Sequence, residues 1–222
     1  MNQYQLHLII LFTIFPLFAC QKTLNNNLET DYNSYINEFE LIQENPKNNT
    51  RIKITSPKAI INTQSKDIEI FNSSMQIFSK NSNNVEVLAA NLSLNNTKNL
   101  IRAYNNVSIN LINNSNSFIR TNSLDWDLTS SNIIIDSPLD FNFENTSIDS
   151  ANGLYNIDLS QLKLNNNVFK RSIMNNNGEA MYNLIIKSDI AQWLDNNKSL
   201  EFTSNNNQVE TIINFLRIKE IK

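Results

Sequence analysis

The residue types that most often carry chemistry are scarce in this chain of 222 residues. His7 is the only histidine and Cys20 the only cysteine, and both lie in the N-terminal segment. Zinc sites draw mainly on histidine and cysteine, and nucleophilic serine or cysteine residues are usually activated by a histidine base. The sequence therefore predicts no histidine-based catalytic pair, no metal site and no bound cofactor. A lone cysteine also cannot form a disulfide within the chain.

Asp125 and Asp127 come closest to an acid–base pair. Residues two apart on a strand share a face and lie about 7 Å apart, which would suit an inverting glycoside hydrolase. The two aspartates alternate, however, with Leu124, Trp126 and Leu128. This alternation is typical of an amphipathic strand whose carboxylates face water. A carbohydrate-active enzyme is therefore a minor hypothesis, and we expect the protein not to be an enzyme.

Alternation of apolar and polar residues is the dominant pattern of the chain. It is clearest over residues 121–164, where Ser130–Asn132, Asp136–Pro138 and Asn145–Ser147 supply turn-forming residues between strand-like segments. Successive side chains of a strand point to opposite faces, so each segment predicts a strand with one apolar and one polar face. We expect Gly153, one of only two glycines, to allow an unusual backbone angle or a close approach of strands.

An internal repeat extends this pattern. Segments that begin at Met75, Val107 and Leu139 are spaced by 32 residues. Repeated β-units bury their apolar faces only against one another, which predicts one continuous all-β domain, a two-sheet β-repeat sandwich. We place this domain at residues 36–222, most regular over 36–164. Within the remainder, residues 165–180 are read as a long loop or a weak strand pair, and the C-terminal tail as a strand or a short helix.

The N-terminal segment predicts export. Residues 1–19 are largely apolar, and the run is shorter than the roughly 20 residues that span a bilayer. It ends in Leu17-Phe18-Ala19-Cys20, which resembles the lipobox of bacterial lipoproteins and predicts lipidation of Cys20. An uncleaved anchor and a plain signal peptide are the alternatives. Residues 20–35 are expected to form a polar tether, with a short helix near Tyr32 and Tyr35 as a competing interpretation.

The charge of the chain does not favour nucleic acid as a partner. The net charge is −3 and the isoelectric point about 5.2. The sequence has no block of basic residues, so nothing in it favours nucleic acid as a partner. Apolar ligands and protein partners remain.

The apolar faces of the two sheets could fill a closed core or line a groove for acyl chains, and alternation does not separate these possibilities. We take the inward-facing residues of the most regular segments as candidate groove residues. They are Leu92, Leu94, Ile109, Leu111, Trp126, Ile133, Ile135, Phe141, Phe143 and Leu154.

Two stretches resemble a known family. Residues 36–73 are similar to the opening signature of the lipopolysaccharide-export periplasmic protein C family. Residues 121–164 resemble its later signature, with a tryptophan–aspartate strand, a Ser137-Pro138 strand, and a Gly153-Leu154 strand ending in Asp158. The related OstA-like bridging proteins give much the same signal.

The resemblance implies an open β-jellyroll with an apolar interior groove that carries lipopolysaccharide. It also implies a place on the periplasmic side of the cell envelope, anchored to the inner membrane. The partners would be an inner-membrane ABC transporter and a periplasmic bridge protein of the same fold, both met by edge-strand addition. The leading hypothesis is thus a lipid-transfer component of lipopolysaccharide export. The alternative is a structural or adhesive β-repeat lipoprotein with a closed core and no lipid.

Overall fold

A computed structural model of the chain describes residues 33–45, 50–79, 84–111, 117–175, 177–195, 198–205 and 208–215. The export segment at residues 1–19, Cys20 and most of the expected tether lie outside these ranges.

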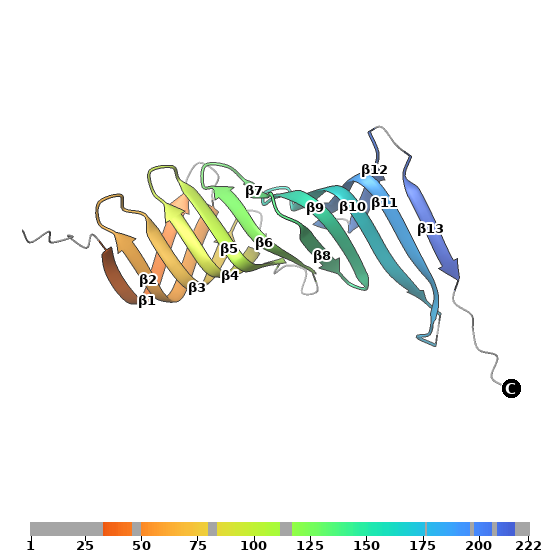
Figure 1. Cartoon of the computed structure of the whole chain (residues 1–222), viewed down its shortest axis with the longest axis horizontal. Coiled ribbons are helices and arrows are strands. Elements are labelled where there is room, and N and C mark those ends of the chain that lie inside the picture. Colours follow the sequence, from red (N-terminus) through yellow and green to blue (C-terminus); the bar gives the residue numbers. More distant parts are fainter. Residues whose placement is uncertain are drawn as a thin grey trace, which may run out of the picture. The chain divides into compact units, whose positions relative to one another are not determined.

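The described residues form one antiparallel sheet of 13 strands (Figure 1). Consecutive strands pair along most of its length; β7 and β8 lie end to end between β6 and β9, and β12 and β13 both pair with β11. The strands are β1 (Asn33–Asn45), β2 (Thr50–Asn62), β3 (Ile68–Phe78), β4 (Asn84–Asn95), β5 (Leu100–Leu111), β6 (Ser117–Asp127), β7 (Asn132–Ile135), β8 (Leu139–Phe143), β9 (Thr146–Asn156), β10 (Gln161–Met174), β11 (Ala180–Leu194), β12 (Ser199–Thr203) and β13 (Glu210–Phe215).

Most of the long strands contain a corner at which burial shifts by one residue. In β3, Ile68 and Ile70 are buried, and the pattern resumes at Ser73. In β10, Leu162 and Leu164 are buried, and the pattern resumes at Asn167. Two consecutive residues face outward at each corner, which turns the strand so that both of its halves direct their apolar side chains inward. The corners therefore fold the single sheet into two facing layers.

Asparagine and serine residues build these corners. Asn72 and Asn166 have φ angles of 50° and 52°, the left-handed region that asparagine tolerates better than most residues. At the next corner position, the Ser150 hydroxyl lies 2.7 Å from the carbonyl oxygen of Asn165 and 2.9 Å from that of Asn152. The asparagine run that starts at Asn165 is thus a strand corner and not a loop.

We name the layers after the strands confined to them. The β7/β12 layer contains β7, β12 and the β11 segment Ile190–Leu194 that pairs with β12. The β8/β13 layer contains β8, β13 and the β11 segment Tyr182–Lys187 that pairs with β13. Figure 1 shows the two sets of half-strands lying one behind the other.

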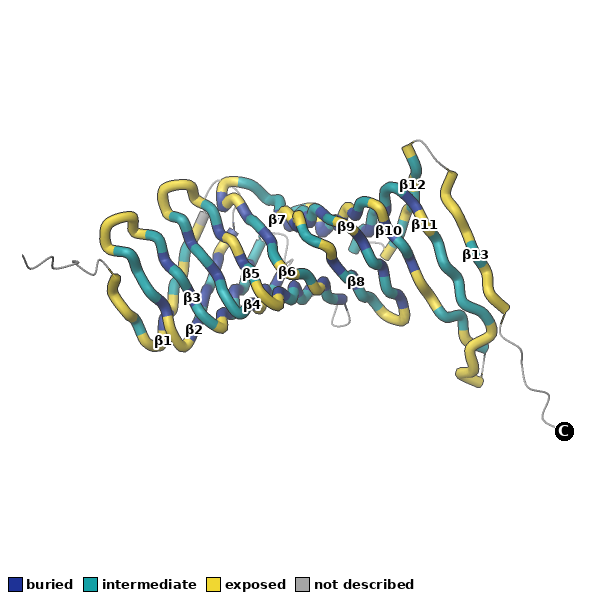
Figure 2. Tube along the Cα trace, viewed as in Figure 1, coloured by how far each residue is buried: buried dark blue, intermediate teal, exposed yellow. Residues whose placement is uncertain are grey.

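The core lies between the layers (Figure 2). Phe141 of β8 meets Trp193 of β11 with ring centroids 5.0 Å apart, and Phe169 meets Phe202 of β12 at 5.3 Å. Both pairs join one layer to the other. The all-β prediction is confirmed: the expected two sheets are one hydrogen-bonded sheet folded on itself.

Three sequence expectations are settled by the strands. Residues 165–180 belong mainly to the pair β10 and β11, so the long-loop interpretation is wrong. Residues 210–215 of the tail form a strand. Strand β1 begins at Asn33, so Tyr35 lies in a strand and not in a helix, and the sheet starts three residues before position 36.

Gly153 is explained by close packing. A Cβ atom there would lie 2.9 Å from Cδ2 of Leu139 and 3.2 Å from the carbonyl oxygen of Lys163. Of the two predicted reasons for this glycine, close approach is the correct one.

Candidate functional site

Nine of the ten predicted groove residues face the space between the layers. Phe143 is half-buried against the core. The other eight are between 0% and 3% exposed: Leu92, Leu94, Ile109, Leu111, Trp126, Ile133, Ile135 and Phe141.

Leu154 is the exception and lies on the outer face. In β9 the inward positions near it are Gly153 and Tyr155, and Leu154 is paired across the outer surface with the exposed Ile134. The corner between Ser150 and Gly153 shifts the alternation by one residue. Gly153 occupies an inward position but has no side chain to indicate it. The sequence pattern therefore assigned the inward position to Leu154, one residue further along the chain.

The interior is filled along β2–β10. Its largest fully buried side chains include Trp126, Tyr155 and Phe141, each at most 1% exposed. Burial raises the pKa of the Tyr155 phenol to about 12, so this group stays neutral at physiological pH. The two layers are therefore in close contact over this part of the sheet.

The interior opens beyond β10. Leu184 and Ile186 of β11 and Leu200 of β12 are only partly buried, although they face inward. In β13, Ile213 is 49% and Phe215 80% exposed. Figure 1 shows β12 and β13 diverging from the strand they share. The inward face of β12, β13 and the β11 segment Tyr182–Lys187 is therefore apolar and only partly covered, and we refer to this surface as the apolar trough.

Sequence reasoning missed this trough. The sequence signal was weak, because Asn183 separates Tyr182 from Leu184, but the apolar Ile185 separates Leu184 from Ile186. The asparagine-rich stretch before β11 was interpreted as a long loop or a weak strand pair, so this surface was not predicted.

An aromatic cluster and an ion pair hold the layers together where the filled interior meets the trough. Trp193 contacts Phe141 and also Phe143, the latter with ring centroids 6.1 Å apart. At the rims of the layers, Nζ of Lys198 lies 3.7 Å from a carboxylate oxygen of Glu144. This exposed ion pair contributes at most about 1 kcal/mol, so the aromatic contacts dominate.

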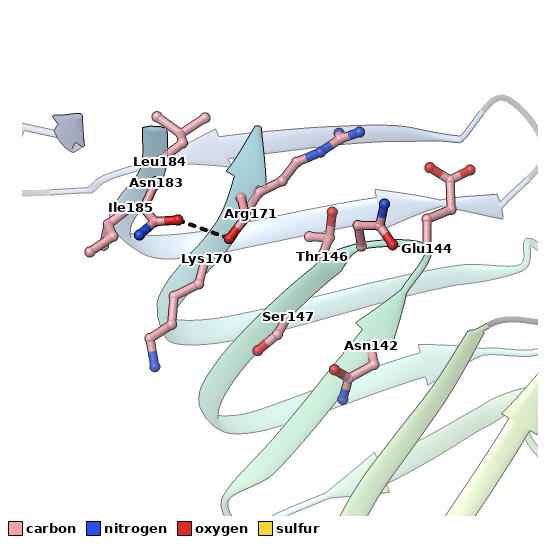
Figure 3. Close-up of a pocket in the computed structure, with 11 residues that line it drawn as sticks. Asn142, Glu144, Thr146, Ser147, Lys170, Arg171, Asn183, Leu184 and Ile185 are labelled. Carbon is pink, nitrogen blue, oxygen red and sulfur yellow. Dashed lines mark hydrogen bonds between the residues drawn. The ribbon is translucent and has the colours of Figure 1, made fainter. Parts of the chain in front are cut away.

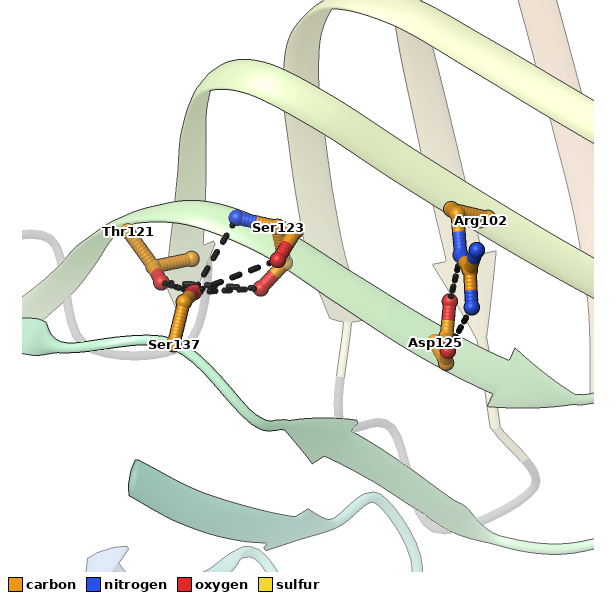
Figure 4. A network of polar contacts seen from close by, with 5 residues as sticks. All are labelled: Arg102, Thr121, Ser123, Asp125 and Ser137. Atoms are coloured by element: carbon orange, nitrogen blue, oxygen red, sulfur yellow. Dashed lines mark hydrogen bonds and ion pairs between the residues drawn. The ribbon is translucent and has the colours of Figure 1, made fainter. Parts of the chain in front are cut away.

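Asp125 and Asp127 do not form a catalytic pair. The Asp125 carboxylate accepts two hydrogen bonds of 2.6 Å from the Arg102 guanidinium (Figure 4). Asp127 accepts hydrogen bonds from the hydroxyl and the backbone amide of Thr129, which lower the pKa of its carboxyl group. Each carboxylate is engaged separately on the outer face, as expected for the polar side of an amphipathic strand.

A hydroxyl cluster marks the corner between β7 and β8. The Ser137 hydroxyl lies 2.6 Å from that of Thr121 and 3.1 Å from the carbonyl oxygen of Ser123 (Figure 4). These contacts tie the β7–β8 connection to β6. They satisfy backbone groups, and no group of potential metal ligands occurs among the described residues.

Asp140 and Asp149 are directly opposite on the outer face of β8 and β9. Desolvation first, and then the interaction with Asp149, raise the pKa of Asp140, while Arg120 opposes the shift. The hydrogen bond from Lys170 lowers the pKa of Asp149. Asp140 is thus the carboxyl group that the fold disfavours when ionised.

We predict that Asp140→Asn stabilises the protein at neutral pH by roughly 0.2–1 kcal/mol, since like charges directly opposite destabilise a sheet. A raised folded-state pKa means that stability falls as the pH rises above 3.8, the ordinary aspartate value. The gain should therefore disappear below that pH. Urea unfolding of both proteins at pH 7 and pH ~3 tests this, and equal stability at pH 7 contradicts it.

The folded sheet with its apolar interior defines an all-β, jellyroll-like protein. Residues 6–172 match the family model described as Lipopolysaccharide-assembly, LptC-related, and the chain belongs to this family. The family is a non-enzymatic component of lipopolysaccharide transport, periplasmic and associated with the inner membrane. No curated protein matches the chain. Strands β11–β13 lie beyond the matched residues.

Among the described residues, no helix is long and apolar enough to cross a membrane.

Proposed function

We propose that this protein carries lipopolysaccharide from an inner-membrane ABC transporter toward a periplasmic bridge protein and the outer membrane. The observation that carries the proposal is the apolar trough, which continues the inward face of the predicted groove residues. Each methylene group that leaves water for such a surface gains about 0.8 kcal/mol. An acyl chain laid along β11 would thus be stabilised without any specific polar contact.

Entry into the filled part requires the layers to separate. The aromatic cluster around Trp193 and the Glu144–Lys198 ion pair are the contacts that must part. The proposal therefore has two stages: the trough receives the acyl chains, and the groove residues of β4–β8 line the path that opens.

The edges of the sheet provide the proposed protein contacts. Strand β1 is one edge, and β12 and β13 form the other. Apolar side chains are exposed on both, including Tyr35 and Ile42 on β1 and Ile213 and Phe215 on β13. An exposed edge with apolar residues favours pairing with another chain. Domains of the same fold would thereby join into a continuous sheet.

We further propose that Cys20 is lipidated and anchors the protein on the periplasmic face. Labelled palmitate that enters the wild type but not Cys20→Ser tests the anchor. Equal labelling of both proteins contradicts it.

In-cell photo-crosslinking tests the carrier function. A photoreactive phenylalanine analogue at Phe143 faces inward, and the same residue at Asp140, on the outer face of the same strand, is the matched control. We expect a lipopolysaccharide adduct at position 143 and none at position 140.

The filled interior of β2–β10 favours the alternative, a structural or adhesive lipoprotein with a closed core. This alternative predicts no adduct at either position with the protein folded and abundant. Adducts of equal yield at both positions would indicate surface contact with lipid and contradict the groove.

A further inference from the structure

The chain contains two Asn-Gly dipeptides, and the fold places them in different environments. Asn152-Gly153 lies inside β9, whereas Asn177-Gly178 lies in the turn between β10 and β11. Both glycines of the sequence thus follow an asparagine. Such pairs are prone to deamidation, because glycine has no Cβ atom to hinder its backbone nitrogen from approaching the asparagine side chain.

The dipeptide in β9 is held by the sheet on both sides. Gly153 is paired with Ile135 of β7 and with Leu164 of β10. The Asn152 side-chain oxygen accepts a hydrogen bond of 2.6 Å from Nδ2 of Asn165. Reaction at this position requires the strand to open locally, and opening a paired strand costs far more free energy than opening an exposed loop.

The second dipeptide lies at the end of the β10–β11 hairpin. Beyond Arg171, β10 pairs only with β11 among the described strands, and the Ser172 hydroxyl donates a hydrogen bond of 2.8 Å to the Asn183 side chain there (Figure 3). Asn177 and Gly178 are both exposed. A Cβ atom at Gly178 would meet no other atom within 4 Å. The reacting groups and water therefore have free access to this turn.

The hydrogen bonds of the turn are local. The Asn175 side-chain oxygen accepts hydrogen bonds of 2.9 Å from the backbone amides of Asn177 and Glu179. The backbone nitrogen of Gly178, whose φ is 78°, donates one of 3.0 Å to the Asn175 carbonyl oxygen. This bond occupies the nitrogen that would attack Asn177. It closes a solvent-exposed turn at a hairpin end, however, and such turns open at little cost in free energy.

We propose that Asn177 is the principal site of spontaneous deamidation in the folded protein. The backbone nitrogen of Gly178 loses its proton and attacks Cγ of Asn177. The new N–Cγ bond closes a succinimide ring, the Cγ–Nδ2 bond breaks, and Nδ2 leaves as ammonia after taking up a proton. Water then opens the ring at either carbonyl group, which gives aspartate or isoaspartate.

The product changes the charge and the main chain of the turn. It adds one negative charge two residues before Glu179, whose carboxylate accepts a hydrogen bond of 3.0 Å from Nδ2 of Asn175. Isoaspartate also inserts an extra carbon atom into the backbone. The same end of β11 carries Tyr182, whose ring centroid lies 5.8 Å from that of Phe215 in β13. Deamidation would thus loosen the hairpin beside an edge strand of the sheet.

The test incubates the full-length protein at mildly alkaline pH, folded and, in parallel, unfolded in guanidinium chloride. Peptide mass spectrometry follows the loss of the side-chain amide at Asn152 and Asn177. An isoaspartate-specific methyltransferase measures the isoaspartyl product. The variant is Asn177→Gln, because glutamine would have to close a larger and less favourable ring. Circular dichroism verifies that the variant is folded.

In the folded protein we expect Asn177 to react about tenfold or more faster than Asn152, because an exposed turn opens more often than a paired strand. In guanidinium chloride the two rates should approach each other, since the fold no longer separates the sites. The rate at Asn177 should rise with pH, because the attacking nitrogen must lose its proton. Asn177→Gln should remove most of the methyltransferase signal.

Three results would overturn the proposal. Equal rates in the folded protein, or faster reaction at Asn152, would mean that the fold does not select the site. An Asn177 that stays intact in the folded protein would mean that the hydrogen bonds of the turn protect it. A methyltransferase signal that persists undiminished in Asn177→Gln would assign the principal site to another asparagine.

Discussion

Replacement of Trp193 by alanine is expected to lower the free energy of unfolding by about 3–5 kcal/mol. Trp193 is 0% exposed and reaches from β11 to the facing layer, where it contacts Phe141 and Phe143. The substitution would remove these contacts and leave a cavity between the layers. Urea unfolding followed by circular dichroism gives the value.

The matched control is Ile134→Ala on β7, an outer-face residue that is 41% exposed. Its substitution should change stability by only about 0.5 kcal/mol or less. A loss below about 1 kcal/mol for Trp193→Ala would mean that the layers are already apart at this position in solution. Such a result would favour an open groove in the resting protein.

Proline substitutions at the two ends of the sheet are each expected to weaken the binding of a different protein partner. Along an edge strand, every second backbone N–H group points outward and can donate a hydrogen bond to an added strand. Of two adjacent residues, one therefore supplies such a donor, and proline at that residue removes the N–H group. We would place proline at Ile212 or Ile213 of β13, and at Leu41 or Ile42 of β1. Main-chain hydrogen bonds supply much of the affinity in strand addition.

We expect one position of each pair to reduce association with one partner by tenfold or more, because several hydrogen bonds of about 1 kcal/mol each depend on an intact edge. Co-purification with the transporter and with the bridge protein measures this, and each end serves as the control for the other. If proline at both ends leaves both partners bound, strand addition is wrong. If either end affects both partners equally, the two contacts are not at opposite ends.

The sequence alone established the class of structure. Alternation at Leu124–Leu128 and Leu139–Phe143 predicts strands because the two faces of a strand are read locally, residue by residue. The lack of histidine beyond His7 removed most catalytic chemistry without any knowledge of the fold. The two stretches that resemble the family lie within residues 6–172, over which the family match holds.

Alternation failed where a corner intervened. The expected inward position of Leu154 depended on an unbroken alternation across Ser150–Gly153, and the stretch from Asn165 was read as a long loop or a weak strand pair. In β10 the left-handed Asn166 changes which face the next residues occupy, and in β9 the two consecutive outward residues between Ser150 and Gly153 do the same. Whether a given asparagine ends a strand or bends it depends on the strands that pair with it, and the local sequence does not contain that information.

Strand type, amphipathicity and the lack of catalytic groups were thus determined by the sequence, since each depends on neighbours one or two residues away. Only the tertiary structure showed that the interior is filled along β2–β10 and partly uncovered at β12, β13 and the β11 segment Tyr182–Lys187. It also placed Phe141 of β8 against Trp193 of β11 across the two layers. These features depend on register and on the packing of two layers, which join residues far apart in sequence.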